Sequence, residues 1–292
     1  MKNFDLLEPR TLPEAVSLLD PEDPGVRAIA GGTALMLMMK SRLYQPARLI
    51  SLRRLNGDLR GVRRMNDGSL RIGAMTTLAE VEYSHEVARA FPVIHAAMPA
   101  LSNIRIRNVA TIGGHLAHGD PHMDLPPILL TLGARVRAVS VRGERWIPLA
   151  ELFTGYYETA LSHDELIADV ELPKQPLGVH GWYAKFTSLS ADDWPAVGVA
   201  VWFRRDSGVI AEARVAVSSA TDRPIRMAGA EAELNNAIAG EATFARAATA
   251  AAEEVQPIAD LRGTVAYKRE MVRVQVRRAL EQALKSNPSE AS

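Results

Sequence analysis

One early segment constrains the fold most, because it alternates strand-like and helix-like stretches around a pair of glycines. An apolar stretch at residues 26–29 ends in Ala30-Gly31-Gly32-Thr33. A helix-like run continues to about Leu43, and a second strand-like stretch at residues 48–52 follows Pro46. Since glycine and proline mark the ends of elements in this way, the segment predicts a small strand–helix–strand unit.

The helix-like run contains six consecutive apolar residues, 34–39. This run is far shorter than the roughly 20 residues that cross a bilayer, so we expect it to form a buried helix face. The first five residues lack the basic stretch and apolar core of a signal peptide. The sequence therefore predicts a cytoplasmic protein without a membrane span.

The composition narrows the class of partners. The 292 residues are 47% hydrophobic, which is enough to bury the core of one large domain or two modest ones. The 34 basic residues balance 34 acidic ones, so no net charge attracts nucleic acid or an anionic membrane. The chain has no cysteine, which excludes disulfides and the thiolate ligands of iron–sulfur clusters.

A mixed region follows the first unit. Between residues 59 and 170, strand candidates at 70–72 and 135–141 alternate with loops and helical stretches, which indicates an α+β arrangement. The stretch 174–178, which contains Pro176 and follows Pro173, predicts a linker to a second region.

The second region opens near Gly181 and begins with strands. An antiparallel meander is predicted from three candidates, at residues 183–187, 197–203 and 210–217. Helices follow, and the last, at 264–285, carries an apolar stripe of Val272, Val276, Leu280 and Ala283. Its basic residues fall mostly off that stripe, and these are Lys268, Arg269, Arg273, Arg277 and Arg278. We expect a solvated basic surface there, with docking of a partner as the alternative.

The first glycine pair suits a phosphate. In Ala30-Gly31-Gly32-Thr33 the paired glycines allow unusual backbone angles and a close approach of amide N–H groups to a ligand. The start of the following helix adds unpaired N–H groups and partial positive charge, and Thr33 can cap the helix or bind a phosphate oxygen. A tight turn with a capped helix explains the same residues, so this motif alone does not distinguish a phosphate site from a structural turn.

A second glycine pair suggests a second cradle. It lies in Thr111-Ile112-Gly113-Gly114-His115. Two such turns suit a diphosphate, because each can supply several backbone donors without a side-chain cation. Neither turn has the spacing of a Walker loop or of the Gly-x-Gly-x-x-Gly fingerprint, which disfavours an ordinary NTPase or nicotinamide-binding fold.

The residues after the second pair offer a rival hypothesis. Imidazoles and carboxylates cluster within ten positions, at His115, His118, Asp120, His122 and Asp124. Such groups can ligate a divalent metal, so a metal-dependent hydrolase that uses His115, His118 and His122 is one alternative. Against it, Gly119 and Pro121 are expected to prevent a regular helix with His115 and His118 on one face.

The two glycine motifs and several later stretches resemble one family, the FAD-binding medium subunits of molybdenum hydroxylases. This family includes the flavoprotein subunits of carbon monoxide dehydrogenase and xanthine dehydrogenase. The resemblance runs nearly end to end, through Ala30 to Thr33, Thr111 to Gly114, Asp120-Pro121, Asp124-Leu125-Pro126-Pro127 and residues 9–19, 104–109, 155–166, 220–226 and 260–269.

The resemblance implies an α+β fold of two domains. Residues 1–175 would form an FAD-binding domain of the vanillyl-alcohol-oxidase/p-cresol-methylhydroxylase type. It would divide into a small βαβ subdomain, 1–57, and a larger α+β subdomain, 58–175. Residues 178–288 would form a C-terminal flavoprotein domain with a three-stranded antiparallel sheet and a helical bundle.

The resemblance also implies roles for individual residues. The FAD diphosphate would lie against a set comprising Ala30, Gly31, Gly32, Thr33, Ala34, Thr111, Gly113, Gly114 and His115, with His118 and Asp120 nearby. Asp124 would bond a ribityl or ribose hydroxyl, and Lys185 would lie near the isoalloxazine ring; an exposed strand lysine is the alternative. Ala34 stands where many members have Asp or Ser, and His115 where Asn or Ser is common. The roles of Asp193 and Trp194 stay open.

The implied function is electron relay. A small subunit would pass electrons through two [2Fe–2S] clusters to noncovalent FAD in this chain, and a large molybdopterin-binding subunit would oxidise substrate. A dimer of heterotrimers is the expected assembly, and the absence of cysteine agrees with this division of roles. The alternatives are a self-sufficient flavin oxidoreductase, the metal-dependent hydrolase and a non-catalytic nucleotide-binding assembly subunit.

Overall fold

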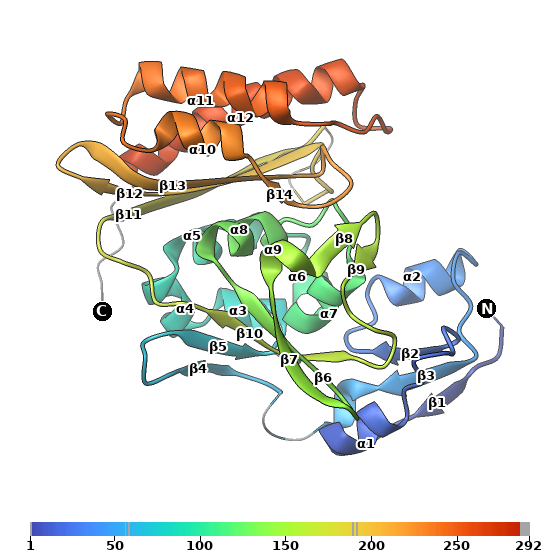
Figure 1. Cartoon of the computed structure of the whole chain (residues 1–292). Helices are drawn as coiled ribbons and strands as arrows, with labels where there is room; N and C mark the ends of the chain where they lie inside the picture. The colour runs from blue at the N-terminus through green and yellow to red at the C-terminus, as the bar shows by residue number, and fades with distance from the viewer. Residues whose placement is uncertain (1, 56, 58, 189, 191, 287–292) are drawn as a thin grey trace.

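The computed structural model describes residues 2–55, 57, 59–188, 190 and 192–286. Figure 1 shows a small unit at the N-terminus, a larger mixed part beside it, and a C-terminal sheet with its helices above the mixed part. The chain thus forms successive layers, and helices such as α5 (Pro92–Ala97) and α8 (Leu125–Leu132) lie between the upper and lower sheets.

The N-terminal unit is a three-stranded parallel sheet of order β1-β3-β2. Its elements are β1 (Asp5–Leu7), α1 (Leu12–Ser17), β2 (Val26–Ile29), α2 (Leu35–Lys40) and β3 (Arg48–Ser51). The predicted strand–helix–strand unit is confirmed, and β1 is an additional strand. Because the chain crosses from β1 to β2 and then back to β3, right-handed connections place α1 and α2 on opposite faces, as Figure 1 shows.

The larger mixed part contains an antiparallel sheet of order β4-β5-β10-β6-β7. Its strands are β4 (Val62–Arg64), β5 (Leu70–Gly73), β6 (Arg135–Ser140), β7 (Gly143–Pro148) and β10 (Leu166–Leu172). The other helices of this part are α3 (Leu78–Glu82), α4 (His85–Ala90), α6 (Ile104–Arg107), α7 (Ile112–His118) and α9 (Leu149–Leu152). It also contains the 3-10 turn η2 (Met98–Ala100) and the short hairpin of β8 (Phe153–Gly155) and β9 (Glu158–Thr159), whereas the 3-10 turn η1 (Leu52–Arg54) directly follows β3 in the N-terminal unit.

Helix α8 anchors this part to the layer above. Its eight residues are all buried, prolines occupy its first turn, and Gly133 ends it with a left-handed φ of 73°. Proline is compatible with a first helical turn and glycine with a left-handed C-terminal cap, so the local sequence defines both ends. Asp124, which precedes the helix directly, is thereby held at a fixed place between the layers.

The C-terminal part is an antiparallel sheet of order β11-β12-β13-β14. The strands are β11 (Val179–Phe186), β12 (Val197–Asp206), β13 (Val209–Ser218) and β14 (Ile225–Arg226), and the helices are α10 (Ala228–Leu234), α11 (Glu241–Glu254) and α12 (Val265–Lys285). The predicted meander is confirmed, and β14 adds a two-residue fourth strand. The helices cover one face of this sheet in Figure 1.

Strand β12 is buried on both faces. Val199, Val201 and Phe203 belong to the core shared with the C-terminal helices, while Ala200 and Trp202 belong to the core of the mixed part below. Since successive side chains of a strand point to opposite faces, one strand contributes to both cores. The two parts of the chain therefore pack against each other through an apolar interface.

One sequence expectation about burial is met in part, and another is wrong. The run 34–39 was expected to form a buried helix face; Met39 is buried, Leu37 is exposed, and the other residues of the run are half-buried. Lys268 was counted among the surface cations, yet it is 1% exposed, because α12 turns it under the sheet toward the backbone carbonyl of Ser219. Of the other basic residues of α12, Arg273 and Arg277 pair with glutamates near the helix surface.

Candidate functional site

The first glycine loop connects β2 to α2 and has unpaired amides. Gly32 adopts a φ of 72°, in the left-handed region that favours glycine. Within the described part of the chain, no hydrogen bond satisfies the backbone N–H groups of Gly31, Gly32, Thr33 and Ala34. Four consecutive free amides at the start of a helix form a set of donors suited to an anion.

The second glycine pair is the first turn of helix α7 rather than a loop. Thr111 caps the helix by accepting a hydrogen bond from the Gly114 N–H at 3.2 Å. The N–H groups of Ile112 and Gly113 donate to the carbonyls of Thr76 and Ala74, both at 2.9 Å, and that of His115 donates to Thr111 at 2.8 Å. The expectation of a second cradle of free backbone donors is therefore wrong in this structure.

The two glycine pairs nevertheless lie side by side. A Cβ atom built on Gly31 would approach the Val109 carbonyl oxygen to 2.1 Å, and one built on Gly114 would lie 3.3 Å from the Cβ of Ala30. Gly113 packs as tightly, since a Cβ there would lie 2.5 Å from the Cβ of Ala74. The second pair thus permits a close approach of α7 to the first loop.

His115, the residue after Gly114, has a buried imidazole nitrogen. Its Nε2 has no hydrogen-bond partner among the described residues. Burial and then the neighbouring His118 lower the pKa of His115 to about 4, so the imidazole is neutral near pH 7. Burial also lowers the pKa of His118, whose ring makes an edge contact with Tyr157.

Asp124 and Lys185 form a buried pair across the two parts of the chain. Lys185 Nζ lies 3.2 Å from an oxygen of Asp124 and 2.8 Å from the carbonyl of Ala100, and its side chain is 7% exposed. The alternative of an exposed strand lysine is therefore wrong. Burial raises the pKa of Asp124, although Lys185 opposes the shift.

Tyr183 is a member of this cluster that the sequence analysis did not single out. Its hydroxyl donates to the second oxygen of Asp124 at 2.6 Å. Burial, followed by the charge of Asp124, raises the pKa of Tyr183 well above its usual value. Residues two apart on a strand share a face, so the position of Lys185 on β11 was a signal that Tyr183 faces the same way.

A second polar chain links the segment after α7 to the C-terminal part. His122 places Nδ1 3.0 Å from Asp120 and Nε2 3.2 Å from Asp260, and Asp260 in turn lies 2.8 Å from Lys268 Nζ. Burial alone would raise the pKa of Asp120, but the hydrogen bonds from His122 lower it below its usual value. Asp120 is therefore committed to holding this segment in place.

The expectation that His115 and His118 do not share a regular helix is wrong. Helix α7 does extend to His118, and Gly119 ends it with a φ of 67°, so His115 and His118 do lie on one regular helix. Even so, across the described residues no group of three His, Asp or Glu side chains is arranged to hold a metal ion. His122 is instead turned away to bridge Asp120 and Asp260.

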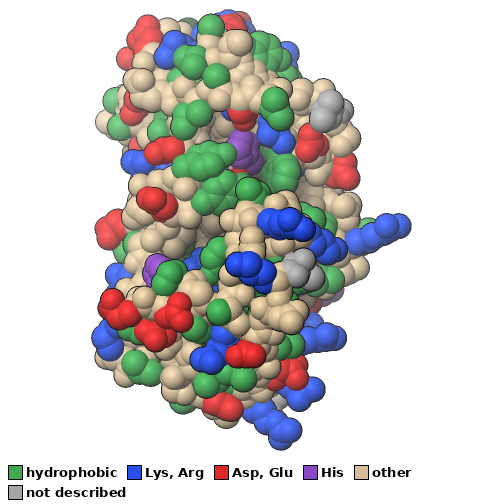
Figure 2. Space-filling view, turned by 90° about the vertical axis from the view of Figure 1, so that its right-hand side faces the viewer, with side chains coloured by type: hydrophobic (Ala, Val, Ile, Leu, Met, Phe, Trp, Pro, Cys, Tyr) green, Lys and Arg blue, Asp and Glu red, His purple; other side chains and the backbone are tan. Residues whose placement is uncertain are grey.

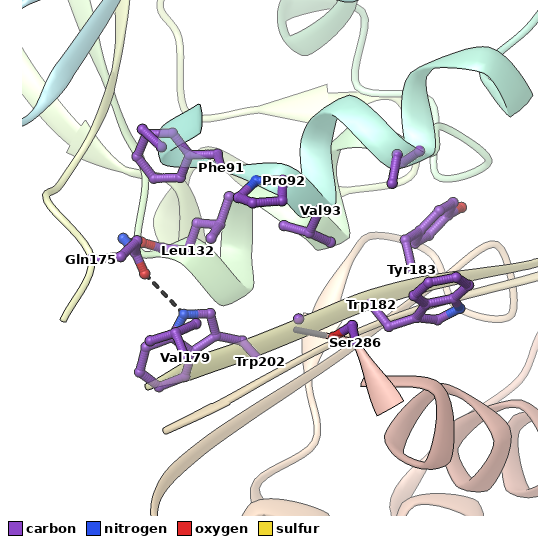
Figure 3. A pocket seen from close by; sticks show the side chains of 14 residues that line it. Phe91, Pro92, Val93, Leu132, Gln175, Val179, Trp182, Tyr183, Trp202 and Ser286 are labelled. Carbon is purple, nitrogen blue, oxygen red and sulfur yellow. Dashed lines mark hydrogen bonds between the residues drawn. The ribbon is translucent and has the colours of Figure 1, made fainter. Parts of the chain in front are cut away.

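An apolar cavity of about 140 Å³ lies between α5 and the C-terminal sheet, and Tyr183 is one of its lining residues. Figure 3 shows Phe91, Pro92 and Val93 on one side and Val179 and Trp202 on the other. The only hydrogen bond drawn joins Trp202 to Gln175, at 2.9 Å. The cavity is smaller than the 300–1,000 Å³ that is typical of small-molecule pockets, so it does not match a dinucleotide site.

Figure 2 views the molecule from the side on which α2 lies in Figure 1, and it shows hydrophobic side chains gathered beside a histidine in the upper half of this face. Trp194, whose role was left open, is 51% exposed, and the guanidinium of Arg262 lies 5.5 Å from the centre of its ring. The Asp193 carboxylate accepts a hydrogen bond from the Trp194 N–H at 2.8 Å.

Comparison with known families decides the family of this chain. Residues 2–175 match the FAD binding domain in molybdopterin dehydrogenase, and residues 182–283 match the CO dehydrogenase flavoprotein C-terminal domain. The chain belongs to the molybdopterin dehydrogenase flavoproteins. The resemblance inferred from the sequence is confirmed, and with it FAD as the cofactor of the family and oxidoreductase as its class.

Known molybdopterin dehydrogenase flavoproteins match along nearly the whole chain. The nicotine 6-hydroxylase medium subunit of Paenarthrobacter nicotinovorans is 34% identical, over 94% of this chain and 95% of its own length. The carbon monoxide dehydrogenase medium chain of Hydrogenophaga pseudoflava is 33% identical, over 96% of each. Both are named as subunits or chains of larger enzymes.

Solved structures of molybdopterin dehydrogenase flavoproteins confirm the fold. Carbon monoxide dehydrogenase from Hydrogenophaga pseudoflava, in a form lacking the Mo-pyranopterin moiety of the molybdenum cofactor, matches with a TM-score of 0.93 and 32% identity, over 97% of this chain and 98% of that chain. Quinoline 2-oxidoreductase from Pseudomonas putida 86 matches with a TM-score of 0.90 and 27% identity, over 97% and 98%. Within the described residues, no helix combines the length and apolarity needed to cross a membrane.

Proposed function

We propose that this chain binds one noncovalent FAD between its two glycine pairs and relays electrons from the [2Fe–2S] clusters of a small partner subunit to an external acceptor. A large molybdopterin-binding subunit oxidises the substrate, and the complex is a cytoplasmic dimer of heterotrimers. In this proposal residues 1–175 form the FAD-binding domain, divided after residue 57, and residues 178–288 form the C-terminal domain. Residues 58 and 288 lie outside the described residues.

The observation that carries the proposal is the run of four free amides at residues 31–34. Buried or half-buried donors without partners are costly in a folded protein, and a diphosphate supplies several acceptor oxygens for them. A Cβ at Gly31 or Gly113 would meet neighbouring backbone or side-chain atoms, so both positions keep the loop and α7 in close approach.

The side chains around the loop fit the same ligand. His115 has a buried Nε2 without a partner, and a neutral imidazole can donate one hydrogen bond from that atom to a phosphate oxygen or hydroxyl. Thr111 is used as the cap of α7, so we assign it a structural role beside the diphosphate. His118 packs against the ring of Tyr157, and Asp120 is hydrogen-bonded to His122, so we assign both a structural role next to the site.

Asp124 and Lys185 are proposed to lie at the flavin end of the site. Each oxygen of Asp124 accepts one hydrogen bond from this chain, and a carboxylate has further lone pairs for a ribityl or ribose hydroxyl. Lys185 is held between Asp124 and the Ala100 carbonyl, so its charge is fixed rather than mobile. A fixed cation favours negative charge on a neighbouring ring.

FAD supplies the ability to exchange electrons one or two at a time. The chain contributes binding and orientation through its amides, a fixed positive charge through Lys185, and exclusion of water through the apolar contact between its two parts. It supplies no cysteine for a cluster, so the clusters of the proposed relay belong to another polypeptide. No observation favours the self-sufficient oxidoreductase, the hydrolase or the assembly subunit over this relay.

The first test is cofactor release. Denaturing the purified yellow protein is expected to release about one equivalent of FAD into the supernatant, because the chain has no thiol for covalent attachment. A colourless protein that contains stoichiometric zinc or manganese would support the hydrolase instead.

The second test uses Lys185→Met in the assembled complex. Rapid-mixing spectroscopy should show a lower flavin potential or slower reoxidation by the acceptor, while reduction of the molybdenum centre by substrate stays near the wild-type rate. Lys174→Met, at an exposed linker lysine, is the matched control and should change neither half-reaction. An isolated chain that oxidised the organic substrate unaided would contradict the relay.

A further inference from the structure

Three neighbouring strands of the C-terminal sheet place a lysine, a glycine and a serine in one row. In the register of the sheet, Gly198 of β12 lies between Lys185 of β11 and Ser218 of β13. Tyr183 lies two residues before Lys185 on β11, so the two side chains share the face that packs on the mixed part. Both of them therefore reach Asp124 from the same side.

Gly198 leaves a space that the Tyr183 hydroxyl occupies. A Cβ atom built on Gly198 would lie 2.7 Å from this hydroxyl and 2.6 Å from Ser218 Oγ, which is closer than a Cβ atom tolerates. The φ of Gly198 is not in the left-handed region, so the backbone conformation does not require glycine here. Glycine inside a strand weakens it and often marks a close approach to the backbone. At Gly198 the groups that approach are the tyrosine hydroxyl and the serine hydroxyl.

Strand β11 holds the Asp124 carboxylate at two points. The Tyr183 hydroxyl donates to one oxygen at 2.6 Å, and Lys185 Nζ lies 3.2 Å from the other. Donors on both oxygens fix the plane of the carboxylate, whereas a single donor would let it turn about its Cβ–Cγ bond. The lone pairs that remain then point in set directions, where a further donor can reach them.

Packing alone does not account for the hydroxyl of Tyr183. Its ring lines the apolar cavity beside α5, and a phenylalanine ring would fill the same space. The hydroxyl instead supplies the Asp124 carboxylate with a hydrogen bond to a charged group, which is stronger than one between neutral groups. Burial raises the pKa of Asp124, while the charge of Lys185 and then the hydrogen bond from Tyr183 oppose the shift. Among the described residues, these are the two titratable groups that act on Asp124.

We propose that Tyr183 is a positioning residue of the flavin site: seated over Gly198, its hydroxyl holds the Asp124 carboxylate in the orientation that accepts a cofactor hydroxyl. This rests on the proposed function, in which Asp124 bonds a ribityl or ribose hydroxyl of FAD. Tyr183 acts through Asp124 and not by touching the cofactor. Gly198 belongs to the same arrangement, because a side chain there would displace the tyrosine hydroxyl.

The first variant is Tyr183→Phe, which removes only the hydroxyl. Loss of one hydrogen bond to the carboxylate should weaken FAD binding about 10-fold near pH 7 in a titration of the apoprotein. Because a hydrogen bond to the charged form lowers a pKa, its removal raises the pKa of Asp124. FAD affinity should then decline at a higher pH than in the wild type as the pH falls. Tyr83→Phe, at a tyrosine that is 68% exposed, is the control and should change neither the affinity nor its pH profile.

Gly198→Ala tests the same arrangement from the neighbouring strand. Its Cβ should push the rigid tyrosine ring away from Asp124, so FAD binding should weaken about as much as in Tyr183→Phe. The double variant should bind FAD no more weakly than Tyr183→Phe alone, because the new Cβ then crowds only Ser218 Oγ. No hydrogen bond within the described part of the chain holds this oxygen, so it can rotate away. Gly240→Ala is the control, since its backbone is extended and a Cβ there meets nothing within 4 Å.

The results separate this inference from the proposed function. Wild-type FAD affinity in Tyr183→Phe would overturn the positioning role. Weaker binding with an unchanged pH profile would overturn it as well, and so would additive losses in the double variant. If thermal unfolding shows that Gly198→Ala does not fold, the pH profile of Tyr183→Phe decides alone. A wild-type chain that binds no FAD would refute the proposed function and this inference together.

Discussion

The two glycine pairs look alike in sequence but differ in what their backbones do. At Gly31 and Gly32 the amides are free and Gly32 has a left-handed φ, whereas at Gly113 and Gly114 the amides are hydrogen-bonded within α7 or to neighbouring carbonyls. Neither glycine of the second pair has a positive φ. One pair therefore provides donors and an unusual conformation, and the other provides space for close packing.

This difference separates two uses of glycine that a motif cannot distinguish. Where the conformation is needed, a residue that tolerates positive φ should substitute for glycine, but an alanine or valine should not. Where only space is needed, the damage should follow the distance from the new Cβ to its neighbours. Substitutions at the two pairs can therefore break or sharpen the comparison.

Gly32→Val should have the largest effect, and it should fall on flavin binding. A β-branched residue in the left-handed region costs about 1–3 kcal/mol. A Cβ there would also lie 3.1 Å from the end of the Ile29 side chain, which can give way, so relief of the φ strain is what would shift the loop and misplace its amides. Charge-assisted hydrogen bonds contribute about 1.5–3 kcal/mol each, so FAD affinity should fall at least about 100-fold in a titration of the apoprotein.

Gly32→Asn is the matched control, because asparagine is the residue that best tolerates this conformation after glycine. The Gly32→Asn variant should retain most of the flavin affinity that the Gly32→Val variant loses. If Gly32→Val bound FAD as tightly as the wild type, the first loop would be an ordinary turn and the assignment of its free amides would fail.

Gly113→Ala should instead act on stability. The new Cβ would lie 2.5 Å from the Cβ of Ala74 and 2.9 Å from its carbonyl oxygen, so α7 must move away from the sheet. Overpacking of this kind costs about 1–3 kcal/mol, which should lower the melting temperature by several degrees. Thermal unfolding of the apoprotein measures this. Adding Ala74→Gly, which removes the nearer contact, should restore part of the loss; no recovery would argue against the packing role.

The sequence predicted the layers of the fold well because their signals are local. The strand–Gly-Gly–helix–strand pattern at residues 26–52 and the alternating strands of the meander each depend on neighbouring residues. The burial of α2 was predicted only in part, because the hydrophobicity of Leu37 does not show whether a neighbouring element covers it. Burial of Lys268 was missed because its partners, Asp260 and Ser219, meet it only in the folded chain.

The candidate site was predicted in part. The sequence located both glycine pairs, Asp124 and Lys185, and the structure brings Asp124 and Lys185 together from positions 61 residues apart. It did not show that the amides of α7 are already bonded, since their acceptors at Thr76 and Ala74 come from a distant segment. Hydrogen bonds between segments far apart in the chain cannot be predicted from the spacing of neighbouring residues.

His115→Asn should change how the stability of the fold depends on pH. Burial lowers the pKa of His115 from 6.5 to about 4, so the unfolded chain takes up a proton over this interval and the folded chain does not. His115 therefore stabilises the wild-type fold above pH 6.5, and that contribution is lost as the pH falls toward 4. The loss should be about 1 kcal/mol between pH 6 and pH 5, within the limit of 1.36 kcal/mol per pKa unit.

Chemical denaturation of the apoprotein at several pH values measures this contribution of His115 to the free energy of unfolding. The asparagine variant should be less sensitive to pH across the interval by that amount, whereas His163→Asn, at an exposed histidine, should not differ from the wild type. Identical pH dependence in His115→Asn and the wild type would mean that the imidazole takes up its proton in the folded chain.

Gly114→Ala should have the smallest effect, and it tests the comparison most strictly. Its Cβ would lie 3.0 Å from Thr111 Oγ1 and 3.3 Å from the Cβ of Ala30, so a shift of a few tenths of an ångström suffices. The residue lies in a helix, where alanine is favoured over glycine by about 0.5–1 kcal/mol, and this gain offsets the crowding. Because the Gly114 N–H already bonds Thr111, no free donor is lost. Flavin affinity should change less than about 5-fold and stability by less than about 1 kcal/mol, measured in the same titration and melting experiments. Abolished flavin binding with an intact fold would show that Gly114 touches the cofactor directly, and the distinction between a donor loop and a packing turn would then have to be given up.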